Sequence, residues 1–189
     1  MACWIQNQAR YRKEYFENLE KLDTKYLRFG KGIAELIESG KQKELLPDLI
    51  VYPEREYEIR TEIRGIPILS YLDDYDPVKN VFREKKTGKL KWTQSRVQKH
   101  DQLVFYATAL KAKTGKMPEY CDLDWIETKE TAREIVDFWR EGDKILNITG
   151  RVTSFHREFD EREVERMENL IEKVAGEISA AYKKYLEEI

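Results

Sequence analysis

Residues 65–106 read GIPILSYLDDYDPVKNVFREKKTGKLKWTQSRVQKHDQLVFY. Before them, the stretch 55–63 (REYEIRTEI) alternates apolar and charged side chains, as a half-buried strand does. Gly65 separates this stretch from 66–73 (IPILSYLD), so the two segments are predicted to pair as an antiparallel hairpin. A third strand over roughly 80–86 follows after a short connection. The sequence therefore predicts a three-stranded antiparallel meander.

The rest of the chain alternates helical and extended patterns around this meander. A long helix is expected over 94–114, ended by Gly115. The other predicted elements are helices over 7–22, 24–39 and 130–141, strands over 120–127 and 144–155, and a closing helix that begins after an Asp160/Glu163 capping pattern. This order predicts an α/β fold with a central mixed β-sheet flanked by helices.

Length and composition favour one soluble domain. A chain of 189 residues without repeats or low-complexity linkers fits a single unit. We expect a helical N-terminal part (1–50), a core (51–128) and a C-terminal helix-strand-helix part (129–189). Charged residues make up 37%, and no run is apolar enough to cross a membrane. The two cysteines do not form a disulfide framework, so a reducing, cytoplasmic setting is expected.

Positive charge is concentrated in one part of the chain. Residues 79–116 carry eleven Lys or Arg against two acids, a net of +9, although the formal charge of the whole chain is −2. A block of one sign attracts phosphate backbones whatever the total charge is. A solvated helix face is the alternative explanation.

Acidic residues end two strands of the predicted meander. Asp73 ends 66–73, and Glu84 lies eleven residues later on the next strand, so both carboxylates can meet at one sheet edge. Because paired carboxylates repel each other, such an arrangement favours a hard divalent cation between them, Mg²⁺ or Mn²⁺. Asp74 and Asp76 are alternatives to Asp73, although their place before a proline is typical of turn residues.

Three further side chains and one carbonyl complete this candidate site. Lys86 lies two positions after Glu84, so both point to the same face, where the lysine can orient an attacking water or stabilise charge on a phosphate. The backbone carbonyl of Lys85 is placed to be another metal ligand. Gln102 and Tyr106 share one face of a helix and can hold a phosphate oxygen or the lysine.

These motifs together resemble the PD-(D/E)XK nuclease superfamily, in particular RecB-type nuclease domains and lambda-type exonucleases. The resemblance covers residue 26 to the C-terminus, and its motifs are RFGKGIAELIE (28–38), SYLDDYD (70–76), EKKTGK (84–89), QLVFY (102–106) and WIET (125–128). It implies a restriction-endonuclease-like core, with Asp73 and Glu84 binding metal, Lys86 assisting the water, and Gln102 and Tyr106 supporting substrate and site.

The first motif departs from the family pattern. Several relatives place a histidine where this chain has Ala34, whereas Glu35 matches the acid that others use, so the resemblance implies Glu35 as a helper for the metal. A solvated surface role for Glu35 is the alternative. Many RecB-type relatives also hold an iron–sulfur cluster on four cysteines, which two cysteines cannot build.

The predicted function is hydrolysis of DNA phosphodiester bonds by a Mg²⁺- or Mn²⁺-dependent exonuclease in recombination, repair or phage DNA processing. A DNA-binding module that does not cut is the alternative, and a homo-oligomer or larger assembly is compatible with both. Trp92 can stack on a base or pack in the core. His100 and His156 are expected to be ordinary residues. The predicted DNA-binding residues are Lys89, Lys91, Trp92, Arg96 and Lys99.

Overall fold

One mixed β-sheet organises the molecule. The computed structural model describes residues 8–17, 24–131, 140–141 and 144–188. In these residues six strands pair in the order β1-β2-β3-β4-β6-β5. Their bounds are β1 Glu54–Ile63, β2 Ile66–Asp76, β3 Val81–Gly88, β4 Tyr120–Thr131, β5 Arg140–Glu141 and β6 Lys144–Glu158. Only β3 and β4 pair in parallel; the other neighbours are antiparallel. The predicted α/β class with a mixed sheet is confirmed.

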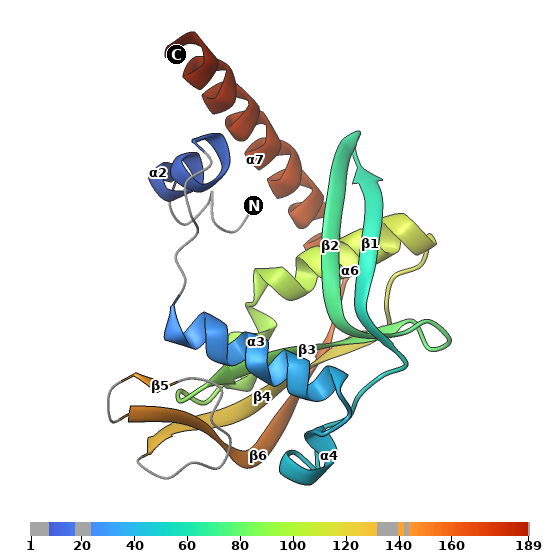
Figure 1. The fold of residues 1–189 in the computed structure, drawn as a ribbon. Coiled ribbons are helices and arrows are strands. Elements are labelled where there is room, and N and C mark those ends of the chain that lie inside the picture. The colour runs from blue at the N-terminus through green and yellow to red at the C-terminus, as the bar shows by residue number, and fades with distance from the viewer. Residues whose placement is uncertain (1–7, 18–23, 132–139, 142–143, 189) are drawn as a thin grey trace.

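The hairpin β1–β2 forms as the alternating pattern predicts. Ile63 pairs with Ile66 across a turn in which Arg64 (φ 52°) and Gly65 (φ 76°) both lie in the left-handed region. Two such residues in a row match the right-handed twist of the strands that they join. Inward side chains, such as Ile59 and Leu72, are fully buried. Figure 1 shows this hairpin rising from the rest of the sheet beside α6.

Helices cover the sheet and pack against two hydrophobic clusters (Figure 1). Their bounds are α2 Gln8–Tyr11, η1 Arg12–Phe16, α3 Lys25–Glu38, α4 Gln42–Leu45, α5 Gln94–Gln98, α6 Asp101–Thr114 and α7 Glu161–Glu188. The larger cluster joins the hairpin and β3–β4 to α6 and the first half of α7. The smaller one joins α3 and the segment after it to β4 and β6. None of the described helices is long and apolar enough to cross a membrane.

The ends of two helices follow their sequence signals. The Thr24 hydroxyl accepts from the backbone of Leu27 at 3.3 Å and so begins α3. The predicted capping box of α7 is present, because Glu163 N donates to Asp160 at 2.8 Å and Asp160 N donates back to Glu163 at 3.3 Å.

The helix predicted over 94–114 is wrong in one respect, because the chain breaks it into α5 and α6. The break satisfies a buried cation: the Arg157 guanidinium on β6 donates to the carbonyls of Val97 (2.8 Å) and His100 (3.1 Å). Both carbonyls also accept from backbone N–H groups three residues on, His100 N to Val97 O at 3.1 Å and Leu103 N to His100 O at 3.0 Å, so Arg157 adds a charged donor at the break.

Of two other predicted helices, one is contradicted at both ends and the other is tested only in its middle. Glu130 and Thr131 belong to β4, and 140–141 is a strand, which contradicts a helix over 130–141; the residues between lie outside the described part. The helix predicted over 7–22 is present as α2 and η1, and 18–22 are not described.

Candidate active site

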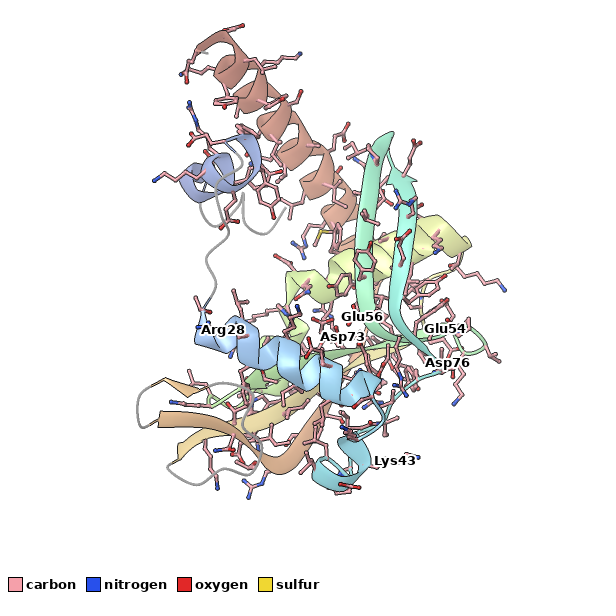
Figure 2. The ribbon with its side chains drawn as sticks, viewed as in Figure 1. Arg28, Lys43, Glu54, Glu56, Asp73 and Asp76 are labelled. Atoms are coloured by element: carbon pink, nitrogen blue, oxygen red, sulfur yellow. The ribbon has the colours of Figure 1, made fainter. Side chains whose placement is uncertain are left out.

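Asp73 lies at the foot of the hairpin, where β2 turns from β1 toward β3 (Figure 2). The opposing position on β1 is Glu56, whose φ of 46° is left-handed although it is not a glycine. Beyond this point β2 pairs with β3 over three residue pairs, Asp74 to Asp76 with Val81 to Arg83. The Asp73 carboxylate accepts from the backbone N–H of Lys85 at 2.5 Å. The side chain therefore bridges the two strands where their ladder ends.

Glu84 is a buried carboxylate next to Asp73. The antiparallel register, extended by one residue from the Asp74–Arg83 pair, sets it opposite Asp73. Its side chain is only 3% exposed, and burial raises its pKa to about 7, with the negative charge of Asp73 as the next cause. One oxygen, Oε1, lies 2.5 Å from Lys86 Nζ, whereas Oε2 has no hydrogen-bond partner among the described residues.

A line of hydrogen bonds holds Lys86 from the helix side. Its Nζ donates to Gln102 Oε1 at 2.9 Å, and Gln102 Nε2 donates to the Tyr106 hydroxyl at 2.7 Å. Burial raises the pKa of Tyr106, and the nearby charge of Glu84 adds to the effect, so the phenol stays neutral. The parallel β3–α6–β4 crossover brings this face of α6 against the Glu84 face of β3.

The neighbouring acids that were alternatives to Asp73 have partners of their own. Asp74 is fully buried, and its carboxylate lies 2.5 Å from the ammonium of Lys85 on β3. Asp76 accepts from the backbone N–H groups of Val78 (3.0 Å) and Lys79 (3.1 Å). Asp76 thus acts as the turn residue that its place before Pro77 predicts.

A cleft of about 200 Å³ opens between α3 and the strands β1 to β3. Its lining includes the carboxylates of Asp73, Asp74, Glu38 and Glu56 together with Arg55 and Lys85. Burial raises the pKa of Glu56, and the charges of Asp73 and Glu38 raise it further. The cleft is therefore acidic at the side where Asp73 lies.

Glu38 and Glu56 were not singled out from the sequence, whereas Glu35 was. Glu35 is exposed and is not among the residues that line the cleft; Glu38, nearly one helical turn later, lines it. A metal-binding role for Glu35 stays a prediction. Counting back from the predicted turn at Gly65 gives the signal for Glu56, since the hairpin register sets it across from Asp73.

The residues present fit a magnesium-type site better than a zinc-type site. In the described part of the chain, no three His, Cys, Asp or Glu side chains gather into a group that could hold a metal ion. Mg²⁺ does not need one, because it keeps several waters and binds through one or two carboxylates plus substrate oxygens. Glu84 Oε2, which lacks a hydrogen-bond partner within the described ranges and lies beside the Asp73 charge, is a suitable ligand atom. The Lys85 carbonyl stays a predicted ligand.

The predicted DNA-binding residues differ in solvent exposure. Trp92 is 7% exposed and belongs to the larger cluster, which favours core packing over base stacking. The exposed Arg96 guanidinium lies 3.9 Å from the centre of its ring. Lys89, Lys91 and Lys99 are also exposed. Trp92 also lies near the candidate site. Its ring is 5.0 Å from that of His100, and burial together with the charges of Lys86 and Arg96 lowers the pKa of His100 to about 4.

His156 on β6 belongs to a network of charged residues that runs across the sheet. Its Nδ1 is 3.1 Å from Asp122, and Asp122 in turn pairs with the buried Arg83 at 2.9 Å. Arg83 also forms a bidentate pair with Asp124, with both contacts at 2.8 Å. This network joins β3, β4 and β6 and explains the polar residues inside the sheet without a ligand.

Comparison with known proteins supports the fold. No protein-family model matches the chain, and no curated protein does. Among solved structures, the crystal structure of a phage-related exonuclease from Haemophilus somnus 129PT superposes with a TM-score of 0.55 and 15% sequence identity, covering 96% of this chain and 84% of that chain. The chain therefore shares the fold of that protein over almost its whole length.

Proposed function

We propose that this chain is a Mg²⁺- or Mn²⁺-dependent deoxyribonuclease that hydrolyses DNA phosphodiester bonds. One observation carries the proposal: a buried glutamate with a free oxygen lies between a second carboxylate and a lysine that is fixed by Gln102. The phage-related exonuclease of similar fold supports an exonuclease, and the motifs around Asp73 and Glu84 support the PD-(D/E)XK superfamily. The exposed lysines beyond β3 support DNA as the substrate.

Each residue has a separate task in this proposal. Asp73, Glu84 and the Lys85 carbonyl would hold the cation, which when bound activates a water and offsets phosphate charge. A bound cation also favours the ionised form of Glu84, whose pKa near 7 otherwise leaves the carboxyl partly protonated at neutral pH. Lys86, held by Gln102, would present its ammonium to the phosphate, where it orients the water or stabilises developing charge.

Gln102 and Tyr106 act on the lysine in this proposal. Because Gln102 accepts from Lys86 and donates to Tyr106, its amide is fixed in one orientation, and the lysine loses little freedom when a substrate arrives. The two residues are therefore positioning residues for Lys86.

The first test is the Lys86→Ala variant. Turnover of linear DNA with Mg²⁺ should fall by about a hundredfold or more, because the charge-stabilising group is lost. Circular dichroism and DNA affinity in EDTA should change little, because Lys86 is not part of the hydrophobic core. Lys183→Ala on α7 is the matched control and should cut like the wild type. Unchanged turnover in Lys86→Ala would refute the assignment.

A DNA-binding module that does not cut is the second candidate, since the exposed lysines fit it equally well. Linear and circular DNA should be incubated with Mg²⁺, Mn²⁺ or EDTA. A non-cutting binder shifts DNA mobility in all three conditions and shortens it in none, whereas the proposed enzyme degrades it only with metal.

A further inference from the structure

The segment between β3 and α6 carries positive charge without any acid of its own. Residues 85–100 contain six Lys or Arg and no Asp or Glu. The acids that flank the segment already have partners, Glu84 with Lys86 at 2.5 Å and Asp101 with Arg166 at 2.6 Å. The surface cations of this segment are therefore not neutralised by carboxylates of the same segment.

One of these cations is held on an aromatic ring. Arg96 is exposed, and its guanidinium lies over the Trp92 ring at 3.9 Å from the ring centre. A guanidinium in this position is attracted by the face of the ring and keeps its N–H groups available at its edge. Across the described part of the chain, the Arg96 guanidinium forms neither an ion pair nor a hydrogen bond. Arg96 is thus a charged donor with a fixed position and without an acceptor.

Both partners of this stack are fixed by the fold. Trp92 is 7% exposed and packs in the larger hydrophobic cluster, so its ring cannot turn away. In α5, Val97 is fully buried, and Gln94 donates to the His156 carbonyl on β6 at 2.5 Å. The backbone that carries Arg96 is therefore anchored to the sheet. A donor that is fixed before binding loses little conformational entropy when its ligand arrives.

The stack of Arg96 on Trp92 borders the candidate active site. The His100 ring lies 5.0 Å from the Trp92 ring, and two residues later Gln102 accepts from Lys86 at 2.9 Å. The charges of Lys86 and Arg96 both lower the pKa of His100, so the two cations act on one imidazole. A strand whose phosphate meets Lys86 can therefore present an adjoining phosphate to Arg96.

We propose that Arg96, held on Trp92, binds a phosphate of the DNA backbone beside the phosphate that is cleaved. That the ligand is DNA and that a neighbouring phosphate is cleaved rest on the proposed function. A guanidinium offers parallel N–H groups to two oxygens of one phosphate. Lys91 and Lys99, which directly precede Trp92 and His100, are also exposed, and repeated positive charges suit a ligand with repeated negative charges. Trp92 is the positioning residue for Arg96.

The test measures duplex binding without cleavage, by fluorescence anisotropy of a short labelled duplex in EDTA at several salt concentrations. Arg96→Ala should lower the affinity about tenfold and reduce the slope of log affinity against log salt concentration by about 1, since one phosphate contact is lost. Arg96→Lys should keep the slope but lose about threefold or more in affinity, because lysine lacks the planar fork. The controls Arg60→Ala and Arg60→Lys change an exposed arginine that pairs with Glu58 on β1, and they should leave affinity and slope unchanged.

A double-variant cycle tests Trp92 as the positioning residue. Trp92→Leu should weaken duplex binding in the wild type and have no further effect in Arg96→Ala, because the ring acts through the guanidinium. Trp92→Phe, which keeps an aromatic face, should lose less than Trp92→Leu. Equal losses from Trp92→Leu in both backgrounds overturn the positioning role. If Trp92→Leu fails to fold, Arg96→Lys at the surface still decides whether the stacked fork matters.

Failure of this inference and failure of the proposed function give different results. Wild-type affinity in Arg96→Ala or in Arg96→Lys overturns the inference even if Mg²⁺-dependent cleavage is intact. Competition by poly-L-glutamate that depends on Arg96 as strongly as duplex binding does assigns the residue to an acidic protein partner and also overturns it. A loss of duplex affinity in both Arg96 variants of a protein that cuts no DNA keeps the phosphate-binding role and refutes the nuclease.

Discussion

Asp73 shares its cleft with other carboxylates, so the contribution of each to metal binding can be separated by substitution. Asp73→Asn should weaken Mn²⁺ binding, measured by isothermal titration calorimetry, by about tenfold or more. The cleft lining predicts that Glu38→Gln weakens binding more than Glu35→Gln does, because only Glu38 reaches the cleft. Full affinity in Asp73→Asn would instead direct attention to Asp74 or Asp76.

His100 provides a pH-dependent stability that is independent of catalysis. Its folded pKa of about 4 lies below the ordinary histidine value of 6.5, mainly because of burial, so the unfolded chain binds the proton more readily. Its contribution to the free energy of unfolding is therefore lost as pH falls from 6.5 toward 4. Between pH 7 and pH 5 this loss should be about 1 kcal/mol, allowing for partial solvent access.

Urea unfolding of the wild type and His100→Gln at pH 7 and pH 5 measures this effect. The loss of stability between the two pH values should be smaller in the variant, since glutamine does not titrate. A pH dependence identical in both proteins contradicts the assignment to His100 and leaves the carboxylates as its source.

The connection between α5 and α6 depends on Arg157. This side chain is 1% exposed and also donates to Glu163 at 2.7 Å, so it joins the α5–α6 connection to the start of α7. Arg157→Ala should lower the free energy of unfolding by about 3–5 kcal/mol, because the Glu163 carboxylate loses its buried cation and the carbonyls of Val97 and His100 lose their charged donor. Arg166→Ala, which removes an exposed pair with Asp101, should cost less than about 1 kcal/mol. Comparable losses in the two variants, measured by urea denaturation, would contradict this role.

The sequence predicts elements well where the pattern is local. The hairpin, β3 and the capping box of α7 depend on alternation, on turn residues or on a four-residue motif, and all three are present. The break at Lys99–His100 depends on Arg157, nearly sixty residues away, and no local signal reports such a contact.

The same distinction applies to the candidate site. The register of β2 and β3, extended by one residue beyond the Asp74–Arg83 pair, sets Asp73 opposite Glu84, and the helical repeat sets Gln102 and Tyr106 on one face, so these placements follow from short-range geometry. Which acid of α3 faces the cleft depends on how that helix packs across the sheet. The same holds for Trp92, because its burial depends on α6 and the sheet around it.

Over the whole molecule, fewer of the Lys and Arg residues in 79–116 are available to DNA than their net charge of +9 suggests. Arg83, Lys85 and Lys86 pair with acids inside the site or the sheet, and Lys111 pairs with Glu161. The exposed cations of the block that remain lie between β3 and α6, among them Lys91, Arg96 and Lys99, and near the end of α6, where Lys113 and Lys116 are exposed.

Salt dependence tests this smaller surface. The double variant Lys91→Ala/Lys99→Ala should reduce the slope of log affinity against log salt concentration by about 2, if each lysine releases about one counterion from DNA. Lys183→Ala/Lys184→Ala on α7 removes the same charge from another surface and should leave the slope unchanged. A reversed order of the two slopes would place the DNA on α7.

The Arg64 guanidinium at the tip of the hairpin donates to Asn169, Glu172 and Glu168 and so joins the hairpin to α7. This helix packs on α6, which carries Gln102 and Tyr106, and it also grips the tip of the hairpin whose foot carries Asp73. Because α7 contacts both elements, a tilt of this helix would shift the strand that carries Asp73 and the helix that carries Gln102 and Tyr106 together.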